Sequence, residues 1–288
     1  KSSKEQHIPI QHRIATFCRD RSLLNKLQIT ETEFFKVVES GDVSQVQKFL
    51  EETPKVDLNS TNYQGLTALD IAVKAENISV ISILLERESL VIGDAVHHAV
   101  STGNYDIIRL LLDTLRAQEP SISDYTYSSE FSERVNPLML AAQQGSYHLI
   151  RLLIERGHYI RRPHIPSCLC KACKRAVKDQ SHDLTVFRLN VYLAISNPAY
   201  ICLTSDDPIL TAFELDDELK LCAQMNEEYR DEYEKMALDA RKFAFDLLSN
   251  CRTLFEVNLV LQQTDGIENV GRLKYPRLQL AVDYKQKS

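Results

Sequence analysis

A ten-residue pattern that occurs four times constrains the fold of this 288-residue chain more than any other feature. The copies begin at Gly41, Glu76, Gly103 and Gly145 and align with one another without gaps. Apolar residues stand at positions five, six, nine and ten of each copy, apart from Gln45 in the first. Because this spacing places one apolar stripe along a helix, each copy predicts an amphipathic helix.

A second helix is expected before each of the last three copies. Ala72, Ala99 and Ala141 each stand four residues before a copy begins, where a small side chain lets two helices approach closely. Residues 65–72 and 136–142 resemble the Thr-Pro-Leu-His-x-Ala-Ala start of an ankyrin repeat. The copies start at positions 41, 76, 103 and 145, so their offsets of 35, 27 and 42 average close to the ankyrin period of about 33 residues.

Helix pairs of this kind bury their apolar faces by stacking on one another. The chain is therefore predicted to be all-α, with an ankyrin-repeat solenoid of about four repeats. A generic helical bundle is the alternative. His97 and His98 fall on a repeat helix and are interpreted as packing or surface residues. The largest insertion, at about 116–135, is polar and is expected to be a loop.

Glycine is scarce, and its placement excludes the common nucleotide-binding loops. The chain has 8 glycines and no Gly-x-Gly, and Gly266-x4-Gly271 is followed by Arg272 and Leu273 where a P-loop has Lys and Ser/Thr. The longest uncharged stretch, 189–205, is interrupted by polar residues and proline, whereas a membrane helix needs about 20 apolar residues.

Charge and residue spacing argue against two further classes of protein. The net charge of −6 disfavours nucleic-acid binding, which needs a basic face, and the basic residues within 161–178 are interpreted as a solvated loop. No spacing indicates a Ser/His/Asp or Cys/His catalytic arrangement, so an enzyme is not expected. The chain begins at Lys1 without Met and is expected to be part of a longer protein.

A candidate metal site follows the fourth repeat directly. His164, Cys168, Cys170 and Cys173 place one imidazole and three thiols within ten residues. Zn²⁺ prefers four such ligands in a tetrahedron, and a shell closed by protein leaves no water to activate, so the predicted zinc is structural. Clustered cysteines do not suit a disulfide framework. This clustering therefore favours a reducing compartment. Three reduced cysteines without a metal are the alternative, and His158 or His182 could replace His164.

The second half of the chain is predicted to be helical. Asp206, Asp207 and Pro208 form a strong helix start, with an acidic N-cap and proline at the first helical position. From Leu215 to Leu247 apolar residues recur at alternating spacings of 4 and 3, which predicts one long helix of about ten turns with a heptad seam. The seam either packs on its own domain or joins two chains. The tail, 273–288, has apolar residues at helical intervals.

Five segments together resemble the transient receptor potential channels of the TRPC type. Residues 162–173 are similar to that family's RPHxxxCxCxxC, and the resemblance covers about Thr32 to Lys287 in register. Residues 216–219 and 180–185 depart from the family pattern, and the chain has no tryptophan, so it is identified as a divergent member. The other four matching segments are 91–100 (VGDALLHAI), 188–198 (RLNxYxALASP), 205–215 (SSxDPxLTAFxL) and 272–287 (RLKLAIxYxQK).

The resemblance implies a domain order and a function. It implies an N-terminal segment (1–30), ankyrin-like repeats (31–160), a zinc-binding loop (161–180) with His164, Cys168, Cys170 and Cys173 as ligands, and a pre-membrane linker-helix domain (181–288). It implies the cytosolic assembly and regulatory domain of a calcium-permeable, non-selective cation channel at the plasma membrane, with the pore outside this chain. The implied partners are other channel subunits in a homo- or heterotetramer, cytosolic regulatory proteins and the membrane. A soluble ankyrin adaptor with a zinc loop is the alternative.

Overall fold

The computed structural model describes residues 21–87, 89–118, 135–165, 168–171, 173–174, 181–262 and 282, with only the backbone of 21–29, 181–184 and 262. Over these ranges the regular structure is α-helical, apart from one isolated bridge between Thr61 and Thr67. The chain forms two compact units, Lys1–Pro120 and Ser121–Ser288, and each is described by itself. The predicted all-α class is confirmed.

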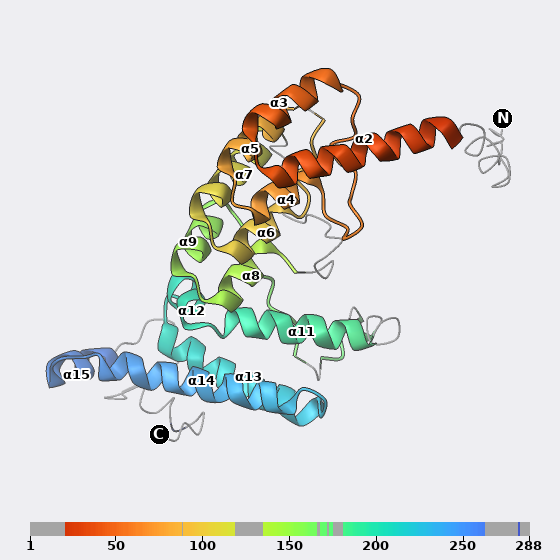
Figure 1. Cartoon of the computed structure of the whole chain (residues 1–288). Helices are drawn as coiled ribbons and strands as arrows, with labels where there is room; N and C mark the ends of the chain where they lie inside the picture. Colours follow the sequence, from red (N-terminus) through yellow and green to blue (C-terminus); the bar gives the residue numbers. More distant parts are fainter. Residues whose placement is uncertain are drawn as a thin grey trace, which may run out of the picture. The chain divides into compact units, whose positions relative to one another are not determined.

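The first unit is a stack of three helix pairs. The first helices of the pairs contact one another in order, and the second helices of the first two pairs also meet (Figure 1). This stacking of helix pairs is the arrangement that the repeated pattern predicts. The pairs are α2 (Arg21–Ser40) with α3 (Val43–Glu52), α4 (Ala68–Lys74) with α5 (Ile78–Leu85), and α6 (Ala95–Thr102) with α7 (Tyr105–Gln118).

The predicted apolar stripes form the core of this first unit. Ala72 and Ala99, the small residues at the helix crossings, are buried. His97 and His98 are buried too, which confirms the packing interpretation over the surface one. The fully buried stripe residues of α5 and α7 are Val80, Ile81, Leu84, Ile107, Ile108 and Leu111.

The turn inside each of the four repeats has left-handed backbone. Gly41, Gly103 and Gly145 have φ values of 71°, 77° and 70°, and Glu76 occupies the same position with φ 54°. The left-handed region is costly for residues that carry a Cβ, which explains why glycine begins three of the four copies.

The second unit opens with the fourth repeat, and a further helix pair packs on that repeat. α8 (Pro137–Gln144) and α9 (Tyr147–Glu155) form the repeat, α11 (Ser181–Ile195) packs on α8, and α12 (Pro198–Thr204) packs on α9. The side chain of Gln143 donates to the Asn190 carbonyl at 2.9 Å across the first of these contacts.

This fifth helix pair does not show in the repeat pattern. Tyr192 stands where the repeats carry alanine, and Thr204 and Ser205 stand where the pattern needs apolar residues. Tyr192 is nevertheless fully buried, so a large ring fills the space at this helix crossing.

The predicted long helix is wrong, because the segment is a helical hairpin. α13 (Pro208–Met225) starts as predicted, with Asp207 Oδ1 accepting from the Leu210 amide at 3.1 Å. It ends at Asn226, whose backbone is extended and whose side chain donates to the Cys222 carbonyl at 3.2 Å. α14 (Arg230–Ser249) then packs back along α13, and α15 (Leu254–Gln262) follows it (Figure 1).

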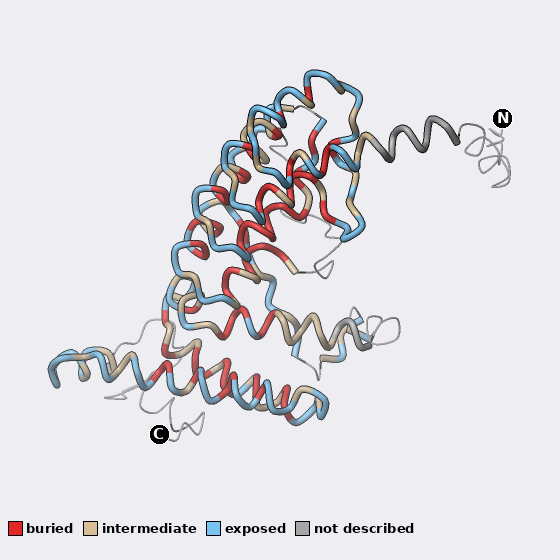
Figure 2. The backbone as a smooth tube through the Cα atoms, in the orientation of Figure 1, coloured by how far each residue is buried: buried red, intermediate tan, exposed pale blue. Residues whose placement is uncertain are grey.

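The α13 part of the apolar seam packs against the α14 part inside the hairpin. Leu219 and Cys222 of α13 are buried, as are Tyr233, Met236 and Ala240 of α14. Figure 2 shows these buried faces as red stretches along both helices. The heptad spacing is therefore satisfied within one chain, as the first of the two expected arrangements requires.

Some expectations concern residues outside the described ranges. These include most of the insertion at 116–135 and nearly all of the tail at 273–288 with its apolar residues at helical intervals. Among the helices that are described, none is both long and apolar enough to cross a bilayer.

Candidate metal centre

The segment that carries His164 leaves α9 without regular structure. Asn136 Nδ2 donates to the Tyr159 carbonyl at 3.1 Å, and Asn136 Oδ1 accepts from the Met139 amide at 2.7 Å as the N-cap of α8. One side chain therefore ties this segment to the start of the fourth repeat.

Four side chains that suit a soft metal ion come together next. The ligand atoms of His164, Cys168, Cys170 and Cys173 all lie within 4.8 Å of one another. Each of the three sulfurs is 3.4 Å from His164 Nδ1. Typical Zn–S and Zn–N bonds in a tetrahedron place sulfur and nitrogen about 3.5 Å apart, so this donor set fits a zinc ion in both chemistry and spacing.

Backbone hydrogen bonds shape the cysteine turn. The Cys168 amide donates to the Ile165 carbonyl at 3.0 Å, and the Cys173 amide donates to Cys170 Sγ at 3.3 Å. This amide lowers the pKa of the Cys170 thiol to about 6, with a further contribution from the Cys173 thiol. The same thiol pair raises the pKa of Cys173 to about 11. The lowered pKa favours the thiolate of Cys170, and the thiolate is the form that binds metal.

The cluster lies near the surface rather than in the core. His164 and Leu169 are exposed, and the three cysteines are half-buried. An ion bound by all four side chains would cross-link a stretch of chain in which the described apolar residues Ile165 and Leu169 are exposed. Such a closed shell has no position for a substrate, which suits a structural ion.

The histidine alternatives differ in their positions. His158 is buried behind the end of α9, where its amide donates to the Leu153 carbonyl at 3.0 Å, and it is not part of the cluster. The side chain of His182 lies outside the described residues. The structure thus brings His164 to the three cysteines, as the first choice from the sequence predicts.

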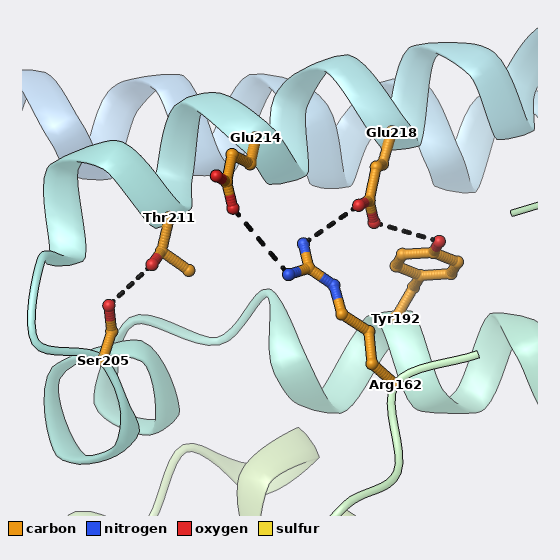
Figure 3. A network of polar contacts seen from close by, with 6 residues as sticks. All are labelled: Arg162, Tyr192, Ser205, Thr211, Glu214 and Glu218. Atoms are coloured by element: carbon orange, nitrogen blue, oxygen red, sulfur yellow. Dashed lines mark hydrogen bonds and ion pairs between the residues drawn. The ribbon is translucent and has the colours of Figure 1, made fainter. Parts of the chain in front are cut away.

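A polar network next to the cluster is not evident from sequence spacing. Arg162 lies 3.8 Å from Glu214 and 3.2 Å from Glu218, and Tyr192 donates to Glu218 at 3.2 Å (Figure 3). Arg162 is therefore not simply a member of a solvated basic loop. Burial raises the pKa of Glu214, and the neighbouring Arg162 opposes that rise. The two carboxylates one helical turn apart are the signal that could have indicated a cationic partner.

Comparison with known proteins agrees with the repeats and with the second unit. The family described as "Transient receptor ion channel II" matches residues 168–230, and ankyrin-repeat families match residues 34–85 and 92–164. The fold and these matches define an ankyrin-repeat protein of the transient receptor channel class.

Individual relatives define the family more closely. The chain is 34% identical over 273 residues to short transient receptor potential channel 4 of Mus musculus, a match that covers 91% of this chain and 28% of that protein. It is 31% identical over 283 residues to short transient receptor potential channel 3 of Homo sapiens, covering 91% and 31%. It is 30% identical over 275 residues to a transient-receptor-potential-like protein of Caenorhabditis elegans, covering 90% and 27%.

The chain belongs to the TRPC family, as an N-terminal region of it, which confirms the resemblance found in the sequence. It spans about three tenths of the length of these relatives. The relatives of Mus musculus and Homo sapiens are named as channels and not as enzymes.

Proposed function

We propose that this chain is the cytosolic assembly and regulatory domain of a TRPC-like, calcium-permeable, non-selective cation channel at the plasma membrane. Identity of 31–34% across nine tenths of the chain to proteins named as short transient receptor potential channels carries this proposal. The proposed domains keep the limits 1–30, 31–160, 161–180 and 181–288, and the proposed partners are further channel subunits and cytosolic regulators.

The surface of α15 supports a role in assembly. Leu254, Phe255 and Leu259 are 82%, 75% and 60% exposed. Large apolar side chains gathered on one short helix are uncommon on a monomer and mark association surfaces. In this proposal the helix packs against other parts of the assembled channel.

We also propose that His164, Cys168, Cys170 and Cys173 bind one structural zinc ion. The 3.4 Å separations of the sulfurs from His164 Nδ1, close to the edges of a zinc tetrahedron, support this assignment. Zinc would join the end of the fourth repeat to the start of α11.

The coding sequence beyond Ser288 tests the channel directly. We expect it to continue into six apolar segments of about 20 residues each, the length that crosses a bilayer. A stop codon immediately after Ser288 would contradict the channel and favour the soluble adaptor. Expression of the continuous reading frame with a C-terminal reporter, followed by membrane fractionation, checks that the segments are used.

A further inference from the structure

The stretch between α9 and the metal cluster is held to helices of the second unit by at least two contacts. Asn136, the N-cap of α8, donates to the Tyr159 carbonyl at 3.1 Å. The second contact is made by Arg162, two residues before His164. These contacts progress along the chain toward the cluster, and Arg162 is the one nearest to a candidate ligand.

Arg162 reaches two acceptors on α13. One guanidinium nitrogen lies 3.8 Å from Glu214 Oε2, and another lies 3.2 Å from Glu218 Oε1 (Figure 3). The two glutamates are one helical turn apart on the same face, where like charges repel. Arg162 compensates both charges, so its position between them is favoured over either single contact.

Glu218, the nearer of these two acceptors, is itself held in place by a buried side chain. Tyr192 of α11 donates to Glu218 Oε2 at 3.2 Å, which leaves Oε1 facing Arg162. The Tyr192 ring is fully buried and packs edge-on against Tyr233 of α14, with 6.1 Å between ring centroids. Three helices therefore hold the carboxylate that receives Arg162.

The backbone between Arg162 and His164 is stiff. Pro163 fixes its own φ near −65°, and the residue before a proline is confined to extended conformations. Because ψ of Arg162 and φ of Pro163 are both restricted, the position of Arg162 limits where the His164 ring can lie.

We propose that Arg162 is a positioning residue of the metal centre. Its ion pairs with Glu214 and Glu218 hold the start of the loop against α13, so that His164 Nδ1 faces the three sulfurs before a metal arrives. This inference rests on the proposed function, because it requires that the four side chains bind zinc. Without Arg162 the loop must be ordered by the ion itself, which weakens binding.

Zinc release from the full 288-residue chain tests the proposal. Zinc-loaded protein is mixed with the chromogenic chelator 4-(2-pyridylazo)resorcinol, and the release rate and the competition constant are measured. We expect Arg162→Ala to release zinc about fivefold faster and to bind it about fivefold more weakly, the size expected for two half-exposed ion pairs. Arg162→Lys should fall between Arg162→Ala and the wild type, and Arg161→Ala, at the exposed neighbour, should match the wild type.

A mutant cycle separates positioning from a general loss of stability. Glu214→Gln with Glu218→Gln should have the same effect as Arg162→Ala, and adding Arg162→Ala to that pair should change nothing further. Far-ultraviolet circular dichroism at saturating zinc should be unchanged in all variants. If Arg162→Ala does not fold, the glutamine pair decides the question, because it leaves the arginine in place.

The outcomes distinguish this inference from the proposed function. Equal release from wild type and Arg162→Ala, in protein that binds zinc, overturns the positioning role alone. If Arg161→Ala speeds zinc release as much as Arg162→Ala does, the positioning role is also overturned, because the faster release would then follow from the loss of one positive charge. A wild-type chain that binds no zinc overturns both the metal site and the positioning residue.

Discussion

At residue scale, the turn inside each of the four repeats shows how one backbone position selects its residue. Gly103 and Gly145 have nearly the same φ, 77° and 70°, but different surroundings. A Cβ on Gly103 would meet nothing within 4 Å, whereas a Cβ on Gly145 would lie 3.1 Å from Asn197 Nδ2. Asn197 in turn accepts from the Ala199 amide at 2.9 Å as the N-cap of α12.

We predict that Gly145→Ala costs more stability than Gly103→Ala. Left-handed strain should cost about 1 kcal/mol at Gly103, after subtraction of the stabilisation that comes from the lower entropy of the unfolded alanine variant. At Gly145 the displaced Asn197 cap adds about 1 kcal/mol. Urea unfolding of both variants measures the difference. In an Asn197→Ala background Gly145→Ala should cost no more than Gly103→Ala, and an equal cost in the wild-type background would refute the Asn197 contact.

The candidate ligands could be predicted from sequence because they are local. His164 and the three cysteines fall within ten residues, so their chemistry and spacing are visible without a fold. The partners of Arg162 could not be predicted in this way, because Glu214 and Glu218 are brought to it by the packing of α13 on the rest of the second unit. Glutamates one turn apart on a helix occur often with no partner beyond solvent.

At the scale of elements, the α13–α14 hairpin shows the limit of periodicity. One long helix and two helices folded on each other show the same heptad pattern of apolar residues in the sequence, because both bury residues at spacings of 3 and 4. The break at Asn226 contains neither glycine nor proline. The repeats, in contrast, could be predicted because glycine marks most of their turns and the apolar stripe recurs at the same offset.

The hairpin is joined by a buried carboxylate. Asp216 of α13 is fully buried, and it contacts Lys220 at 2.5 Å on its own helix and Arg241 Nε of α14 at 3.2 Å. A buried charge that loses a partner is costly, although the partial exposure of Arg241 reduces that cost.

We therefore predict that Arg241→Ala lowers the free energy of unfolding by about 2 kcal/mol. Lys242→Ala, at an exposed position of the same helix, should change it by less than about 0.5 kcal/mol. Asp216→Asn combined with Arg241→Ala should recover part of the loss, because the buried carboxylate charge is removed and the remaining cation, Lys220, is partly exposed to water. Chemical denaturation followed by circular dichroism gives these values, and an Arg241→Ala variant as stable as the wild type would argue against the contact.

At the scale of the whole molecule, the loop that carries the candidate metal ligands lies between two packed helical segments. The loop follows α9 and precedes α11, and both helices pack within the second unit. Ile165 and Leu169, large apolar side chains among its described residues, are 40% and 76% exposed, so a metal ion would supply the cross-link.

We predict that Cys168→Ser with Cys170→Ser loosens this connection. Structural zinc sites contribute about 10–16 kcal/mol of apparent binding free energy, and part of it is coupled to local folding. If about 2 kcal/mol reaches the second unit, its melting temperature should fall by about 4–8 °C. Protease cleavage should increase within 161–180. Cys202→Ser, which changes an exposed cysteine of α12 outside the cluster, is the matched control and should leave both readouts unchanged.

The zinc content of the purified chain tests the proposed structural metal site most directly. Plasma mass spectrometry should find about one equivalent of zinc in the wild type and in Cys202→Ser, as a single closed tetrahedral site requires. It should find little in the double variant Cys168→Ser with Cys170→Ser. A wild-type content below about half an equivalent, or a double variant that keeps its zinc, would contradict the claim that these four side chains hold a structural metal.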